Sequence, residues 1–258
     1  MGKLTNLKSF PQFSVDFGDN SSSKTITESA LFALDSLLYV MNLSLPIQAY
    51  PNALIAFSLH HTHPVCYRES NLIILSCDKN KWNQATYQLA HEICHLMISG
   101  EVVSELCWLE ESICELSSYF FLPKITKYWL RLGRSNNIET TKQNYAPYFE
   151  SYVIADQEKV EPFDLSLLIS DPNASELNSL MNNYDLRKKN AYIAVKLLPI
   201  FKKYPKTWRA IPFLSKIPSG LSFSDSLVKW IELSPTDSHM GLQKIANLFG
   251  APASLAPD

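Results

Sequence analysis

The stretch YQLAHEICHLM, residues 87–97, places His91, Glu92 and His95 in an H-E-x-x-H pattern. The longer segment CDKNKWNQATYQLAHEICHLMISG has Asp and Asn at its start and a glycine at its end, which predicts a capped helix. Residues four apart on a helix share a face, so both imidazoles can reach one metal ion. Glu92 lies about 100° around the helix from His91, within reach of a water on that ion.

This arrangement predicts a hydrolytic zinc site, which has three protein ligands and an open position for water. The bound zinc lowers the pKa of the water, and Glu92 acts as the general base. The competing interpretation is a metal-free helix in which His91 and His95 are hydrogen-bonded core residues. A third ligand therefore decides between the two interpretations.

The third ligand is sought after His95. The following residues, LMISGEVVSE, contain no histidine, which excludes the metzincin pattern H-E-x-x-H-x-x-G-x-x-H. The next helical segment, CWLEESICELSS, offers Glu110, Glu111 and Glu115. Glu111 and Glu115 share a helix face, whereas Glu110 is turned away by about 100°.

HEICH followed by WLEESICE resembles the gluzincin metallopeptidases, the H-E-x-x-H…E class that includes thermolysin and aminopeptidase catalytic domains. In aminopeptidases the second segment reads W-L-N-E-G-F-A, and Trp108, Leu109 and Glu111 match it. The resemblance implies that Glu111 joins the two histidines as a zinc ligand. It also implies that Glu115, four positions later, orients a ligand histidine as in thermolysin-like members.

The resemblance covers residues 70–120, under a fifth of the chain. Fifteen residues separate His95 from Glu111, fewer than in aminopeptidases or thermolysin, and Glu115 fits the family count better. Glu115 therefore stays the alternative third ligand. The G-x-M-E-N substrate motif is absent, so aminopeptidase specificity is not implied. Compact gluzincins related to repressor-cleaving bacterial proteases share the predicted strand–helix–helix layout.

The composition of the 258 residues is that of a globular protein, with 46% hydrophobic and 19% charged residues. Twenty-three basic and 25 acidic residues give a net charge of −2, which predicts no nucleic-acid partner and no binding to a membrane surface. No apolar run reaches the roughly 18 residues of a membrane span. Five cysteines without a C-x-x-C pair indicate reduced thiols and a cytoplasmic location.

The chain is predicted to be an α+β protein with a small antiparallel or mixed sheet. We expect a flexible N-terminal arm over residues 1–24, a gluzincin-like metal-binding region over 25–133 and a helical region over 134–258 packed on it. The segments ALIAFSLHH and PVCYRE are predicted to pair as a hairpin, with a third strand at 72–76. Pro123 is expected to kink or restart the second metal helix. Other helices are predicted near 26–43, 124–132, 147–159, 173–182, 186–203, 223–233 and 237–248.

Several other residues have possible chemical roles. His60, His61, His63 and Cys66 could form a second metal site, although neighbouring strand residues face opposite sides. Cys94 and Cys114, on the two metal helices, are expected to be small core residues. The strand at 72–76 either binds an extended peptide along its edge or is a buried central strand. The candidates for an oxyanion donor are Tyr119, Tyr145, Tyr148, Tyr152 and His239.

The predicted function is zinc-dependent hydrolysis of peptide bonds in a peptide or protein substrate. The predicted zinc ligands are His91, His95 and Glu111, with Glu92 as the base. The alternative is a zinc-stabilised, non-catalytic interaction protein with a closed metal site. An intact Glu92 favours catalysis, because a purely structural site needs no base at that position.

Overall fold

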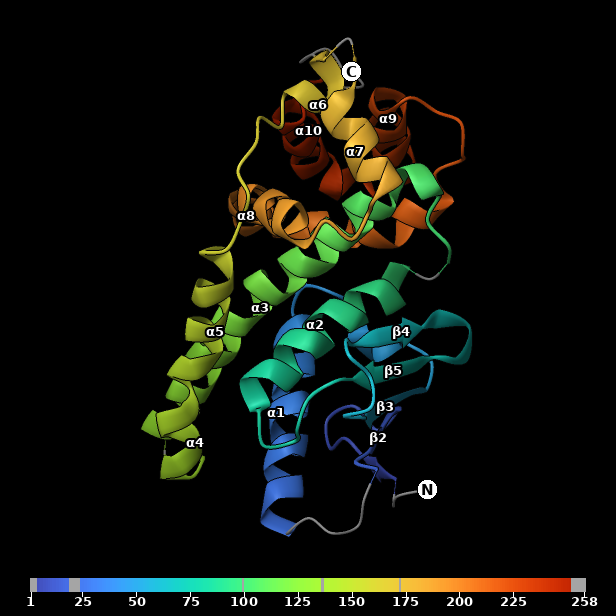
Figure 1. The fold of residues 1–258 in the computed structure, drawn as a ribbon. Coiled ribbons are helices and arrows are strands. Elements are labelled where there is room, and N and C mark those ends of the chain that lie inside the picture. Colours follow the sequence, from blue (N-terminus) through green and yellow to red (C-terminus); the bar gives the residue numbers. More distant parts are fainter. Residues whose placement is uncertain (1–3, 19–23, 99, 136, 172, 252–258) are drawn as a thin grey trace. The chain divides into compact units, whose positions relative to one another are not determined.

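The computed structural model describes residues 4–18, 24–98, 100–135, 137–171 and 173–251. Within these residues it contains ten α-helices and one five-stranded mixed sheet, which confirms the α+β class (Figure 1). The chain forms two compact units, Met1–Leu96 with Ser117–Asp156, and Met97–Leu116 with Gln157–Asp258. The predicted boundary at residue 133 is not where the units divide.

The sheet belongs to the first unit and has the strand order β1-β2-β3-β5-β4. Its strands are β1 (Thr5–Asn6), β2 (Phe13–Asp16), β3 (Ala53–Phe57), β4 (Val65–Tyr67) and β5 (Leu72–Leu75). Strands β2, β3 and β5 are parallel, and β1 and β4 are antiparallel to their neighbours. Side chains on β3 alternate between buried and partly buried, the pattern of a strand whose two faces differ in burial.

The predicted hairpin between β3 and β4 is wrong. Strand β5 lies between them, with Ile73 opposite Ile55 of β3 and opposite Cys66 of β4. The tight reversal is instead between β4 and β5, through a 3-10 turn that ends at Asn71 with φ 49°. Asparagine tolerates this left-handed conformation better than most residues, and so permits the turn.

The N-terminal segment is part of the sheet over residues 4–18, which corrects the expected flexible arm there. Phe13 and Val15 of β2 are fully buried, and β2 pairs with β3 along its whole length. Leu7 and Phe10, before β2, are 2% exposed. Their apolar surface anchors this segment to the core. Part of the predicted arm, residues 1–3 and 19–23, lies outside the described residues.

The helices in the first half of the chain are α1 (Lys24–Asn42), α2 (Trp82–Ile98), α3 (Cys107–Arg134), α4 (Thr140–Tyr145) and α5 (Pro147–Gln157). The predicted helices at 26–43 and around His91 are confirmed. The new helix expected to start after Pro123 is not found, because α3 continues through this proline; residues of α3 belong to both units. Phe121, Leu122 and Ile125 beside this proline are fully buried, and their burial offsets the hydrogen bond that proline cannot donate.

The second unit contains α6 (Leu167–Ser170), α7 (Ser175–Asn182), α8 (Arg187–Lys203), α9 (Phe223–Leu233) and α10 (His239–Leu248), with a 3-10 segment, Pro205–Lys216, between α8 and α9. The helices predicted near these positions are confirmed. Trp208 and Trp230 are buried, and the Trp230 indole donates to the Ala210 carbonyl at 2.9 Å. None of the helices in the described ranges is both long and apolar enough to cross a membrane.

Candidate metal centre

Helix α2 is fixed in place by side chains that bond to it on two sides. The Gln88 amide accepts from the Ser76 backbone N–H and donates to the Ser76 hydroxyl, both at 3.0 Å, which ties α2 to the end of β5. On α3, the Ser117 and Ser118 hydroxyls each donate to a carbonyl of α2, those of Ala90 and Tyr87, at 2.8 Å. The backbone immediately before His91 is therefore held on two sides.

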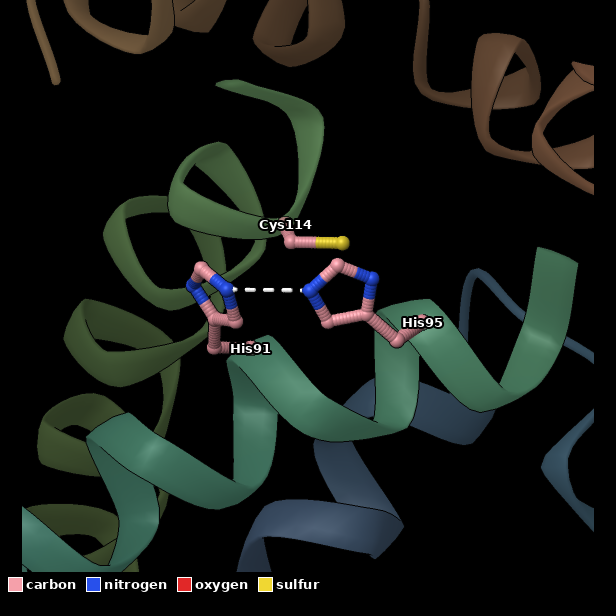
Figure 2. A group of neighbouring side chains, drawn as sticks. All are labelled: His91, His95 and Cys114. Carbon is pink, nitrogen blue, oxygen red and sulfur yellow. Dashed lines mark hydrogen bonds between the residues drawn. The ribbon is translucent and has the colours of Figure 1, made fainter. Parts of the chain in front are cut away.

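His91 and His95 are both partly buried, on the same stripe of α2. Their Nε2 atoms lie 3.2 Å apart, and Figure 2 shows the two rings rising from one side of the helix. Two imidazole nitrogens bound to one tetrahedral zinc ion, at about 2.05 Å each, lie about 3.3 Å apart. The pair therefore has the spacing that a shared zinc ion requires.

The orientation of the His95 ring is set by Arg68, the first residue after β4. The Arg68 Nε donates to the His95 carbonyl at 2.9 Å, and its Nη2 lies 3.1 Å from His95 Nδ1. A guanidinium has no acceptor, so Nδ1 must accept this bond and the ring proton must lie on Nε2. In the metal-free protein, His95 Nε2–H then donates to His91 Nε2. A metal ion on His95 would take the place of that proton.

His95 is held neutral by its surroundings. Burial lowers the pKa of His95 well below its usual range, and the nearby His91 and Arg68 lower this pKa further. A neutral imidazole is the form that binds a metal ion. These surroundings keep His95 uncharged at neutral pH, which is one requirement for metal binding.

Glu92 is 3% exposed and lies close enough to Cys66 of β4 to influence the pKa of the Cys66 thiol. Burial raises the pKa of the Cys66 thiol on β4 to about 12; the charge of Glu92 also raises this pKa, whereas Arg68 lowers it. The Glu92 carboxylate is therefore near both Cys66 of β4 and, in sequence, His91.

A buried thiol lies beside the two imidazoles. Cys114 of α3 is 0% exposed, and its Sγ and one nitrogen of each of His91 and His95 lie within 4.8 Å of one another (Figure 2). A thiolate bound to the same tetrahedral ion would lie about 3.6 Å from each nitrogen. From the sequence alone, Cys114 is expected only to be a core residue. Its spacing of three from Glu111, which puts both on one helix face, is the signal that could have found it.

The predicted glutamates lie on the same part of α3. Glu111 and Glu115 are partly buried, and Glu110 is 5% exposed. Cys114 lies between Glu111 and Glu115 in sequence, so the segment that was predicted to supply the third ligand is the one that reaches the histidine pair. The ligand role of Glu111 and the orienting role of Glu115 stay predictions.

No second metal site is found among the described residues, where His91, His95 and Cys114 are the one group of possible ligands that comes this close. His61 Nδ1 lies 3.2 Å from the Ser58 hydroxyl, and His63 Nδ1 lies 2.8 Å from the Thr62 hydroxyl. Both rings therefore have hydrogen-bond partners within their own loop.

Three of the candidate oxyanion donors are already engaged. The hydroxyl of Tyr119 donates to Asp156 at 2.6 Å, and that of Tyr145 donates to the Asn83 side chain at 2.8 Å. His239 Nε2 lies 2.9 Å from the Ser234 carbonyl, to which it can only donate. These three groups stabilise local structure.

The comparisons with known proteins give no relative: no protein-family model, no curated protein and no solved structure matches this chain.

Proposed function

We propose that this chain is a zinc-dependent metallopeptidase that hydrolyses peptide bonds. The observation that carries the proposal is the 3.2 Å separation of the His91 and His95 Nε2 atoms, which fits two ligands of one tetrahedral ion. His91 and His95 would hold the ion together with one group from α3. Glu111 is the predicted third ligand, and Cys114 is the side chain seen within 4.8 Å of the pair.

Glu92 supports a catalytic role for this centre. When bound, zinc supplies Lewis acidity, which lowers the pKa of water and polarises a carbonyl. The Glu92 carboxylate would accept the proton from the attacking water and later pass it to the leaving amine. Its burial limits the contact of bulk water with that carboxylate, which strengthens electrostatic interactions around it.

The edge strand supports a peptide substrate. Strand β5 pairs with β3 on one side and with β4 on the other, so it is a central strand and cannot bind a peptide along its edge. Within the described residues, β4 ends the sheet, and its outer edge can pair with an extended chain. Arg68, directly after β4, donates a hydrogen bond to the His95 carbonyl, and Cys66 of β4 lies close enough to Glu92 for the pKa of its thiol to be raised. A peptide paired with β4 would therefore run close to the metal centre.

One experiment tests both parts of the proposal. Protein purified without chelator should contain one zinc per chain, and His91→Ala and His95→Ala should each lose it. Glu92→Gln should keep wild-type zinc content and thermal stability but lose roughly two to four orders of magnitude of peptide hydrolysis. Wild-type protein that takes up no zinc at neutral pH would refute the proposal, and so would a fully active Glu92→Gln variant.

The buried thiol favours a second candidate function, a zinc-stabilised interaction protein. If Cys114 and a glutamate both bound the ion, four protein ligands would close the site, as in structural zinc centres. Cobalt-substituted protein distinguishes the two candidates, because a bound thiolate gives a near-ultraviolet charge-transfer band that a Cys114→Ser variant would lack. Zinc binding with this band and without any cleavage of a broad peptide library would favour the closed site.

A further inference from the structure

The basic residues of the second unit are concentrated in one segment. Residues 187–216, RKKNAYIAVKLLPIFKKYPKTWRAIPFLSK, contain nine of the 23 basic residues of the chain and no acidic residue. The whole chain has a net charge of −2, so this segment is strongly positive within a nearly neutral protein. Such segregation creates a local electrostatic potential that the overall charge conceals.

Helix α8 presents this charge on one side. Ile193, Leu197 and Phe201 are fully buried and define its inner side. Successive residues of a helix are rotated by about 100° around its axis. On this basis four exposed lysines lie within an arc of about 120° on the opposite side of α8. These are Lys188, Lys196, Lys202 and Lys203, called here the α8 lysine face.

The charges of the α8 lysine face are not neutralised within the described part of the chain, where none of its four lysines forms an ion pair. Lysines and arginines nearby do find carboxylates: Lys189 bonds to Glu176 at 2.6 Å, and Arg209 to Asp237 at 2.6 Å. Lys196 and Lys203 instead lie 5.2 Å and 5.5 Å from the ring centres of adjacent tyrosines. Four exposed like charges on one rigid helix repel one another, and an anionic partner would relieve this repulsion.

We propose that the α8 lysine face binds the phosphate backbone of double-stranded nucleic acid without reading its sequence. Lys188 and Lys203 are fifteen residues apart, or about 22 Å along the helix. That length matches roughly six base pairs of a duplex, which carries one charge per about 1.7 Å of its axis. The face has no arginine, and lysine binds phosphate as a point charge rather than through the bidentate bonds that read bases.

Two other anionic partners fit the observations less well. A helix that binds a membrane surface inserts its apolar side among the lipids, but the apolar side of α8 is buried within its own unit. A flexible acidic peptide would have to be ordered on binding, which costs free energy. A duplex offers regularly spaced charges that are already ordered.

The test compares two variants with the same change in net charge. The face variant is Lys188→Gln/Lys196→Gln/Lys202→Gln/Lys203→Gln, and the control replaces four exposed lysines elsewhere in the same way. The control lysines are Lys8, Lys81, Lys127 and Lys244. Binding of each full-length protein to a labelled mixed-sequence 20-base-pair DNA duplex is measured by fluorescence anisotropy from 50 to 200 mM salt. Parallel sedimentation assays use vesicles of anionic phospholipid.

Wild type and control should bind the duplex, and their affinity should fall at least about 100-fold between 50 and 200 mM salt, the effect of four phosphate contacts. The face variant should bind at least tenfold more weakly at 50 mM salt. The slope of log K against log[salt] should become shallower by about 3.6. If the fourfold variant does not fold, as judged by circular dichroism, Lys196→Gln/Lys203→Gln should show about half of this change in slope.

Equal duplex binding by the face and control variants would overturn the proposal. Absence of duplex binding at 50 mM salt would also overturn it, as would vesicle binding that depends on the lysine face without duplex binding. None of these measurements involves the metal centre, so failure of the zinc proposal and failure of this one are distinguishable.

Discussion

Replacing Arg68 tests whether its hydrogen bond to His95 Nδ1 opposes zinc binding by His95. In the structure the Arg68 guanidinium lies 3.1 Å from His95 Nδ1 and can only donate to it. When zinc binds the opposite ring nitrogen, a neutral His95 must carry its proton on Nδ1, directly facing the N–H groups of Arg68. The change Arg68→Gln supplies an amide oxygen that can accept from Nδ1–H, the usual partner for a ligand histidine. We therefore expect Arg68→Gln to bind zinc more tightly than wild type.

The size of the effect follows from the geometry. An ion on Nε2 lies about 4 Å from Nδ1, so together with the 3.1 Å contact the guanidinium is within about 7 Å of it. Repulsion between charges of two and one at this distance is about 1 kcal/mol at the dielectric of water and about 5 kcal/mol at an effective dielectric of 20. The lower figure alone corresponds to a gain of about fivefold in affinity.

Competition against a fluorescent zinc chelator at pH 7.5 measures this affinity. Arg134→Gln is the matched control, because Arg134 is exposed and the charge change is the same. The variant should gain roughly fivefold or more in zinc affinity, whereas the control should stay within about twofold of wild type. Unchanged zinc affinity in a folded Arg68→Gln protein would show that Arg68 does not oppose the bound state, and weaker affinity would show that Arg68 supports it. Either result would contradict the expected gain.

Three further changes have defined expectations. If Glu111 is the third ligand, Glu111→Ala should lower zinc affinity more than Glu115→Ala, which should lower it about 10–100-fold. Competition against a zinc chelator measures both affinities, and the reverse order would make Glu115 the ligand. In chelator-treated protein, the lowered pKa of His95 means that the unfolded chain takes up a proton below about pH 6.5 that the native state does not. The free energy of unfolding should therefore fall by up to about 1.4 kcal/mol per pH unit as the pH drops, and His95→Gln should lack this part in urea titrations. Tyr119→Phe should lower the free energy of unfolding by about 1–3 kcal/mol, because it removes a part-buried 2.6 Å hydrogen bond to Asp156. No change in denaturant titrations would contradict the assigned role.

The sequence predicted those parts of the molecule that depend on local spacing. Apolar residues at helical intervals located α1 and the helices of the second unit, and the H-E-x-x-H spacing placed His91 and His95 on one side of α2. A spacing of four residues on a helix fixes which side chains are neighbours, whatever the rest of the chain does.

The errors lie where segments distant in sequence meet. The order β3-β5-β4 depends on which strands pair, and the three short strands carry similar apolar runs that do not specify their partners. Helix α3 passes through Pro123 because its neighbours are buried, a tertiary effect that outweighs the local preference. The position of Cys114 beside the histidines depends on contacts between α3 and α2, whose residues are distant in sequence.

The two units are interleaved along the chain, and this has a consequence for biosynthesis. The first unit needs residues up to Asp156, but the segment Met97–Leu116 in between belongs to the second unit, whose other residues are Gln157–Asp258. At 5–20 residues per second, a ribosome needs roughly 5–20 s to add the hundred or so residues of the second unit that follow Asp156. Throughout that interval Trp108 and Leu109, which are nearly inaccessible in the finished protein, lack most of the residues of their unit. The nascent chain is therefore expected to depend on chaperones most strongly between the completion of its first unit and the completion of its second.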